Sequence, residues 1–347
     1  MNEAAALLSW YRRSRRDLPW RRTRDPWAIW VSEVMLQQTR VEHVIAFFEP
    51  FLERFPSVAA LAEAPLEEAL AAWSGLGYYR RLRLLHRAAK QVMASGGTIP
   101  STEEQLRCLP GVGDYTAAAV SSIAFGACTP VLDGNVIRVL TRRLACAEDP
   151  ARPAVRRRLR AVAAELLDAD AAGDSNQALM ELGATVCTPV VPRCGECPLS
   201  PGCAARANGI PEAFPQRAGK PRPRLVPLVV AVIERGDRVL LFRRDDDEVL
   251  LAGTWELPWV QDGNGDGGDA ASALGARYGG RFTLGAEVGR VRHAITTRRI
   301  VASVRRAGFS ARDDEVREGR EAAWVRRAEV ATLPTSSLVR KALALAP

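Results

Sequence analysis

The residues best suited to chemistry are four of the chain's seven cysteines, which fall between Val186 and Cys203 with the spacing Cys-x6-Cys-x2-Cys-x5-Cys. Thiolates bind zinc and iron–sulfur clusters, and in oxidising compartments they pair as disulfides. No apolar run approaches the roughly 20 residues of a membrane span, and "AAALLSW" continues into "YRRSRR" without a cleavage-type segment, so we expect a cytoplasmic protein that does not enter membranes. In that reducing environment the spacing predicts a metal site whose ligands are Cys187, Cys194, Cys197 and Cys203.

A carboxyl group, Glu33, stands in the apolar text "DPWAIWVSEVMLQQTRVE". A helix that begins at Pro26 would carry an apolar face, with Glu33 off that face and Ile29, Leu36 and Trp30 near it. A carboxyl surrounded by apolar side chains prefers its neutral form, so the pKa of Glu33 should rise and the group would suit a general acid. An isolated helical glutamate is more often a surface residue, and the residues alone leave both interpretations open. The apolar face consists of Trp27, Trp30, Val31, Val34 and Met35.

A turn with two glycines joins two expected helices in "LPGVGDYTAAAVSSIAFG". Gly111 and Gly113 would connect a helix that ends near Leu109 to one that begins near Tyr115, where free N–H groups can face an anion. The net charge is +8, and only three of the 48 basic side chains are lysines. Arginines crowd beside aromatic residues near the N-terminus, which suits either contacts with DNA or a solvated helix face. They are Arg12, Arg13, Arg15, Arg16, Arg21, Arg22 and Arg24.

The elements that position these groups must come from three stretches of the sequence that differ in composition. Residues 1–205 predict an all-helical domain, because apolar residues recur at helical spacing. Residues 206–227 are rich in proline and basic, and predict an extended linker. Residues 228–347 change to short β-branched runs and predict a smaller α+β domain, in which "LVVAVIE" and "RVLLFRR" form a hairpin. The other three cysteines lie in apolar segments that are predicted to be helical, so we expect them to be thiols of the hydrophobic core. They are Cys108, Cys128 and Cys146.

The glycine hairpin near residues 101–127, Asp133 in "VLDGNVIRVL" and the cysteine loop at 187–203 together resemble the helix-hairpin-helix DNA glycosylases of the endonuclease III superfamily. In that family the loop holds a 4Fe-4S cluster, so the resemblance implies this cofactor, whereas the spacing alone leaves zinc open. "SEVMLQQT", with "LPW" before it and "GLGYYRR" after it, resembles the MutY-type branch, which removes adenine paired with 8-oxoguanine. The resemblance covers nearly the whole chain and implies a monofunctional base excision repair enzyme that acts on double-stranded DNA, which we expect to be a monomer.

The resemblance also implies roles for single residues. Glu33 would protonate adenine and Asp133 would stabilise the sugar cation, with Tyr115 and Asn135 in support. The extruded adenine would be held by Arg16, Leu18, Trp20, Arg21, Leu36, Val41 and Gln177. Gln38 and Tyr78 would wedge beside the orphaned 8-oxoguanine, and further DNA contacts would come from Gln37, Gly111 and Gly113.

Base excision explains why two carboxyl groups are needed. Adenine leaves readily only after a ring nitrogen is protonated, and the sugar then carries positive charge that an ionised carboxylate offsets or captures. One buried neutral acid and one charged carboxylate are therefore expected, and the base must leave the stack to reach them. Lyases of this superfamily use a lysine where this chain has Tyr115, so we expect no strand cleavage through an imine.

The C-terminal text "VLLAGTWELP" resembles the core of Nudix-type folds. The glutamate-rich helix that would hold magnesium is missing, so a recognition domain without hydrolase activity is expected. MutY-type proteins commonly present Phe-Ser-His there to detect 8-oxoguanine, and the aligned residues are Ile295, Thr296 and Thr297. Thr296 keeps a hydroxyl that can form a hydrogen bond, whereas Thr297 lacks the imidazole. "DGNGDGGDAASA" imitates half of a calcium loop, but Ala273 replaces the required glutamate, so a Gly-rich turn is expected.

Two alternatives stay open. A mismatch thymine glycosylase of the same superfamily can also carry tyrosine at position 115, although "SEVMLQQT" and the extra domain argue against it. A damaged-DNA-binding protein without catalysis is the second, and the presence of both Glu33 and Asp133 argues against that reading.

Overall fold

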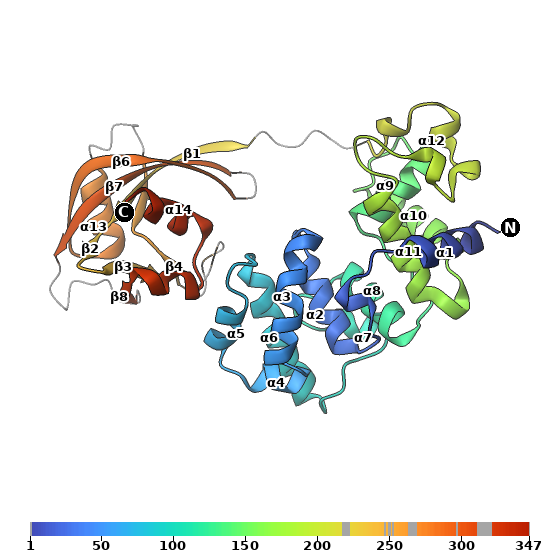
Figure 1. Ribbon diagram of the computed structural model, residues 1–347, viewed down its shortest axis with the longest axis horizontal. Coiled ribbons are helices and arrows are strands. Elements are labelled where there is room, and N and C mark those ends of the chain that lie inside the picture. The colour runs from blue at the N-terminus through green and yellow to red at the C-terminus, as the bar shows by residue number, and fades with distance from the viewer. Residues whose placement is uncertain are drawn as a thin grey trace. The chain divides into compact units, whose positions relative to one another are not determined.

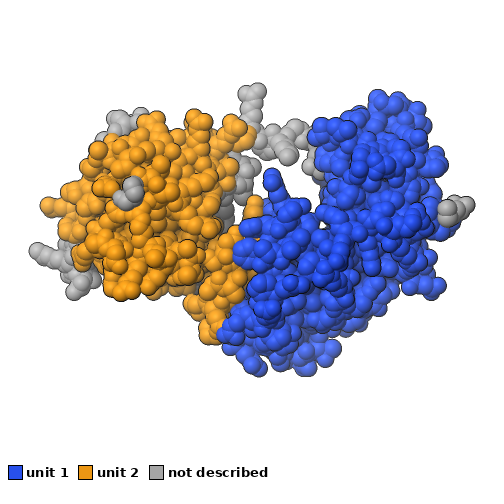
Figure 2. All heavy atoms as spheres, viewed as in Figure 1, with its two compact units in different colours: residues 1–64, 84–220 blue, residues 65–83, 221–347 orange. Residues whose placement is uncertain are grey.

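The computed structural model describes residues 2–216, 223–245, 248, 251, 253–262, 269–295, 298–310 and 321–346. The chain forms two compact units (Figure 2), one made of Met1–Ala64 and Leu84–Lys220, the other of Pro65–Arg83 and Pro221–Pro347. The predicted fold class is confirmed, because helices fill the chain up to the first strand and both sheets follow (Figure 1). The exact domain limits at 205 and 228 stay predictions. Thr296, Thr297 and most of the Gly-rich turn lie outside the described residues.

The helix that carries Glu33 begins where the sequence offers a cap. Asp25 accepts hydrogen bonds from the N–H groups of Trp27 and Ala28, and Pro26 takes the first helical position. Every residue from 27 to 35 is buried, so this helix is covered on all sides and not on one face alone. The helices before the first strand are α1 Glu3–Ser14, α2 Pro26–Leu36, α3 Val41–Arg54, α4 Val58–Glu63, α5 Leu66–Ala72, α6 Tyr79–Ala94, α7 Glu103–Arg107, α8 Asp114–Phe125, α9 Gly134–Arg143, α10 Pro153–Glu165, α11 Ala172–Thr185 and α12 Ala204–Ala207.

The predicted glycine hairpin joins α7 to α8. Gly111 has a φ of +79°, and a Cβ placed on it would lie 2.7 Å from the Cβ of Leu84, so a side chain does not fit there. Gly113 is the N-cap of α8, in an extended conformation with open space around its Cα. The first N–H groups of α8 are therefore left free of side-chain caps, as an anion site requires.

One hydrophobic core of the first unit joins α1, α9, α10 and α11 to the cysteine loop, with Cys187 and Cys197 packed against it. Cys146 is buried in this core, as expected. The expectation was wrong for Cys108 and Cys128, which are exposed. Cys108 is the C-cap of α7, and Cys128 follows the glycine that ends α8, so both lie at helix ends and not on core faces.

The second unit contains two sheets, and the larger one has the strand order β5-β1-β7-β6. β1 runs parallel to β7 and is buried on both faces: Leu228 and Val230 pack toward α14, and Val229 and Ala231 pack toward α13. The smaller sheet pairs β3 with β2, β4 and β8. The elements are β1 Arg224–Val232, β2 Glu234–Arg235, β3 Arg238–Arg243, β4 Trp255–Glu256, β5 Trp259–Gln261, α13 Ala270–Tyr278, β6 Arg281–Ile295, β7 Arg298–Ser310, β8 Ala322–Arg326 and α14 Ser337–Leu345.

The predicted hairpin was only partly right. The turn near Gly236 exists, but it joins β3 to the two-residue strand β2, whereas β1 belongs to the other sheet.

None of the helices in the described part of the chain combines the length and the apolar content needed to cross a bilayer.

Candidate active site and cysteine loop

The candidate acid Glu33 lies on α2 and is only 4% exposed. The Tyr115 hydroxyl, on α8, donates a hydrogen bond of 2.6 Å to its Oε2 atom and also lies 3.5 Å from the sulfur of Met180 on α11. Burial raises the pKa of Glu33 to about 7, although the hydrogen bond from Tyr115 lowers it. A carboxyl with this pKa still carries a proton in many molecules at neutral pH and can donate it.

The second carboxyl, Asp133, is the N-cap of α9. Its Oδ1 atom accepts a hydrogen bond of 2.7 Å from the N–H of Val136, and Oδ2 accepts one of 2.9 Å from the Asn135 amide. Burial raises the pKa of Asp133, while these hydrogen bonds lower it and work against the effect of burial. The start of a helix also favours a negative charge, so this position suits a carboxylate that must stay ionised beside a cation.

A chain of hydrogen bonds leads from Asp133 to the cysteine loop. The Asn135 amide that donates to Asp133 accepts, through its oxygen, a bond of 2.9 Å from Arg138. The Nε–H of Arg138 donates to the carbonyl oxygen of Cys187 at 2.8 Å. The N-cap of α9 and two residues of the helix therefore connect the candidate site to the first cysteine of the loop.

The two arginines predicted to hold adenine are fixed by a buried carboxylate, Glu181 on α11. Arg16 donates to it from its backbone N–H at 3.0 Å and from Nε and Nη2 at 2.8 Å each, and Arg21 donates from Nη2 at 2.8 Å. Burial raises the pKa of Glu181, but the hydrogen bonds from both arginines outweigh it and lower the pKa to about 2. Glu181 is therefore charged at every physiological pH.

The other predicted adenine contacts come from elements that pack together. The short 3-10 helix Pro19–Arg21, which carries Trp20, packs against α2 and α3, and α8 packs against α2 and α11. Leu18, Trp20 and Gln177 are buried, whereas Leu36 and Val41 are half-buried.

Two predicted DNA contacts share an unusual backbone. Gln38 and Tyr78 have φ angles of 57° and 51°, a region that costs non-glycine residues energy. Both are exposed, Tyr78 by 52%. Gln37, by contrast, turns inward, and its amide donates to the Thr116 hydroxyl at 3.3 Å. Residues with a strained backbone are often found at binding sites, and the wedge role of Gln38 and Tyr78 stays a prediction.

Several arginines of the N-terminal cluster form ion pairs within the protein. Besides the pairs with Glu181, Arg22 pairs with Asp17 and Arg24 pairs with Asp174. The exposed members are Arg12, Arg13, Arg15, Arg22 and Arg24. Phosphate contacts from this cluster would therefore come mainly from the exposed arginines of α1 and its C-cap.

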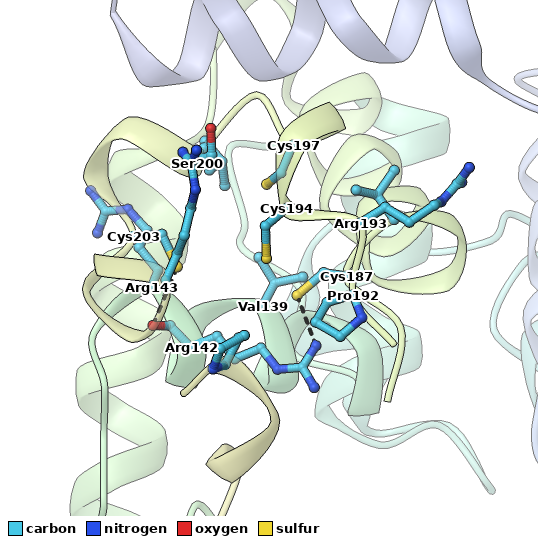
Figure 3. A pocket seen from close by; sticks show the side chains of 14 residues that line it. Val139, Arg142, Arg143, Cys187, Pro192, Arg193, Cys194, Cys197, Ser200 and Cys203 are labelled. Carbon is cyan, nitrogen blue, oxygen red and sulfur yellow. Dashed lines mark hydrogen bonds between the residues drawn. The ribbon is translucent and has the colours of Figure 1, made fainter. Parts of the chain in front are cut away.

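The four loop cysteines line one pocket (Figure 3), and their sulfur atoms lie around the same space. Arg142 is almost fully buried and holds the loop, because it donates to the sulfur of Cys187 at 3.3 Å and to the carbonyl oxygens of Thr188 and Pro189 at 2.7 and 3.0 Å. No group of three or more Cys, His, Asp or Glu side chains among the described residues is arranged to hold a single metal ion. Four thiols that line one pocket are ligands of the kind that both zinc sites and iron–sulfur clusters use.

Two family models match the chain: the HhH-GPD superfamily base excision DNA repair protein over residues 31–165, and the NUDIX domain over residues 228–345. A curated adenine DNA glycosylase of Mycolicibacterium smegmatis is 48% identical over 207 residues, which cover 59% of this chain and 70% of that relative. The chain belongs to the adenine DNA glycosylase family. The human adenine DNA glycosylase is 41% identical over 310 residues, which cover 74% of this chain and 57% of the relative, so the match spans less than two-thirds of the human protein.

Solved structures agree with this family membership at the level of the fold. A thermostable thymine-DNA glycosylase has a TM-score of 0.55 at 29% identity, covering 59% of this chain and 95% of that one. Endonuclease III in a non-covalent DNA complex has a TM-score of 0.50 at 21% identity, covering 59% of this chain and 94% of that one. The second likeness shows the fold alone.

Three residues of this adenine DNA glycosylase family member were missed by the sequence analysis: Arg138, Arg142 and Glu181. Glu181 had a local signal, because it follows Gln177 by four residues and therefore shares its helix face. Arg138 and Arg142 had no such signal. In "VIRVLTRR" they cannot be told from ordinary surface arginines, because their partners lie in the cysteine loop.

Proposed function

We propose that this chain is a DNA glycosylase that hydrolyses the N-glycosidic bond of adenine mispaired with 8-oxoguanine or guanine in duplex DNA. The observation that carries the proposal is the buried pair Glu33–Tyr115, which keeps an acid with a pKa of about 7 inside the glycosylase fold. Membership of the adenine DNA glycosylase family supports the choice of base.

In the proposed reaction, the proton of Glu33 moves to a ring nitrogen of adenine, and the bond between the base and the sugar breaks. The positive charge that remains on the sugar is offset by Asp133, held at the start of α9. Water then adds its oxygen to the sugar and gives up a proton, which restores Glu33. Adenine must first leave the duplex. We assign to Gln38 and Tyr78, which are exposed and have a strained backbone, the role of wedging into the duplex to allow this.

The adenine pocket gains rigidity from the Arg16–Glu181–Arg21 cluster. Because Glu181 uses both oxygens to fix the two guanidinium groups, their remaining donors are held in place before the base arrives. Leu18 and Trp20 supply apolar surface beside them. Recognition of 8-oxoguanine by Thr296, and its weakening by the loss of a histidine at Thr297, belong to this proposal.

The cofactor in this proposal is a 4Fe-4S cluster held by Cys187, Cys194, Cys197 and Cys203. It would supply a structural support for the loop, with Arg142 donating to one of its sulfur ligands. A reducing, cytoplasmic setting and a monomeric state complete the proposal.

The cluster assignment is tested by the metal content of the purified protein. Cys197→Ser should lose iron, acid-labile sulfide and the brown colour, and most soluble protein with them, whereas Cys128→Ser, an exposed thiol outside the loop, should keep all of them. Wild-type protein that is colourless, active and loaded with zinc would refute the assignment.

A thymine mismatch glycosylase is the second candidate, favoured by the structural likeness to a thymine-DNA glycosylase. Single-turnover base release from duplexes with A or T opposite 8-oxoguanine or G, followed by alkaline cleavage, decides between them. We expect release of adenine from both A-containing duplexes, faster opposite 8-oxoguanine, and no strand cleavage without alkali. Release of thymine alone would establish the second candidate, and a borohydride-trappable imine would contradict the monofunctional reaction.

A further inference from the structure

The turn between α5 and α6, residues 73–78, carries Tyr78 and has an unusual backbone. Gly75, Gly77 and Tyr78 have φ angles of 104°, 74° and 51°, so all three lie in the left-handed region. Glycine takes this region freely, but a tyrosine there costs energy and persists only where its surroundings hold it. Tyr78 is 52% exposed, so burial alone does not fix its ring. Other side chains must therefore hold the turn.

Two buried side chains donate hydrogen bonds to carbonyl oxygens of this turn. Trp73 is fully buried, and its Nε1–H donates to the carbonyl oxygen of Gly77 at 3.1 Å. Arg81, in the first turn of α6, is only 7% exposed, and its Nη2 group donates to the carbonyl oxygens of Leu76 and Gly77 at 3.3 and 3.4 Å. The peptide group directly before Tyr78 is therefore held by two side chains.

The guanidinium of Arg81 also contacts the aromatic rings of the turn. Its central carbon lies 5.4 Å from the centroid of the Trp73 ring and 5.6 Å from the centroid of the Tyr78 ring. A cation over the face of an aromatic ring is attracted to it, and both distances lie within the range of this attraction. Arg81 therefore links the exposed ring of Tyr78 to a ring that is fully buried.

A charged side chain is unfavourable at this buried position unless its function requires the charge. Burial lowers the pKa of Arg81 to about 10, which leaves the guanidinium charged at neutral pH. An apolar side chain of similar length would fill the same space without losing the hydration of a charge. Lysine would keep the charge but lacks the planar group that stacks on rings and donates several hydrogen bonds. The contacts of Arg81 therefore favour a role in shaping the turn over a role in core packing.

We propose that Arg81 is a positioning residue for the Tyr78 wedge. Its guanidinium fixes the turn and the orientation of the Tyr78 ring before DNA binds, so the ring enters the duplex without first having to be ordered. Arg81 acts through Tyr78 and not on the reacting atoms. This inference rests on the wedge role that the proposed function assigns to Tyr78, and it adds the residue that holds the wedge in shape.

The extrusion of adenine can be measured separately from its release. In full-length protein that carries Glu33→Gln, release should stop because the amide cannot donate the acidic proton. A 2-aminopurine placed beside the adenine opposite 8-oxoguanine then becomes more fluorescent when the adenine leaves the stack. We expect Arg81→Lys to lower the extrusion rate about three- to tenfold. Arg87→Lys, at an exposed position of the same helix, should leave the rate unchanged.

A second variant and a double-mutant cycle separate positioning from a general loss of structure. Arg81→Met suits the buried position and should lower the extrusion rate as Arg81→Lys does. Tyr78→Ala should also lower the rate, and adding either substitution of Arg81 to it should cause no further loss, because Arg81 acts through the ring. An unchanged rate in both Arg81 variants, or an equal loss with and without the Tyr78 ring, would overturn the proposal.

The same samples distinguish this inference from the proposed function. If Tyr78→Ala extrudes adenine as fast as the protein with Tyr78 does, the wedge role is wrong and the role of Arg81 falls with it. If protein with Glu33 intact releases no adenine while the cycle shows coupling between Arg81 and Tyr78, the proposed reaction is wrong and the positioning role stands.

Discussion

At the scale of single residues, two buried glutamates of the first unit have opposite properties because their neighbours differ. Glu33 receives one hydroxyl hydrogen bond among apolar side chains, and its pKa rises to about 7. Glu181 meets two guanidinium groups, and its pKa falls to about 2. The first can therefore give up a proton near neutral pH, and the second remains a charged clamp.

The sequence predicted only one of these two glutamates. Glu33 lies within apolar text that already implies burial, so its raised pKa follows from local residues. The partners of Glu181 lie 165 and 160 positions away along the chain, and no local pattern reports such a contact. The same limit hid Arg138 and Arg142, whose roles depend on the cysteine loop.

At the scale of elements, the hairpin between α7 and α8 offers a matched pair of glycines. Gly111→Ala should lower the free energy of unfolding by about 2 kcal/mol or more, because its φ of +79° disfavours a side chain and its Cβ would collide with Leu84. Gly113→Ala, with an extended backbone and open space, should change it by less than about 0.5 kcal/mol. Thermal melts of both variants and their affinity for duplex DNA check this. Equal stability would show that the hairpin tolerates a side chain at both positions.

Element types were easier to predict than their pairing. The helices α2 and α8 begin within a residue or two of the predicted starts, since a proline, a cap and two glycines mark them. The path of β1 was not predictable, because its apolar run fits a hairpin as well as a strand buried in the middle of a sheet. Only the packing of α13 and α14 on its two faces decides between them.

At the scale of the whole chain, the change in composition along the sequence predicted an all-helical part followed by a smaller α+β part, and the two family models match those parts. Composition could not reveal the pocket between the larger sheet and α14 in the second unit. Its lining comes from four strands, the segment after β3 and helix α14, so only the fold brings Trp259, Arg244 and Arg298 together.

The most direct test of the central claim is the dependence of kcat/KM for adenine release on pH, which reports the ionisation of the free enzyme. If protonated Glu33 is the acid, kcat/KM for A opposite 8-oxoguanine falls about tenfold per pH unit above a pH of about 7. Tyr115→Phe removes the hydrogen bond that lowers the pKa of Glu33, so the fall should move upward by about one pH unit. A profile that stays flat between pH 6 and about 9, or one that Tyr115→Phe leaves in place, would contradict the account.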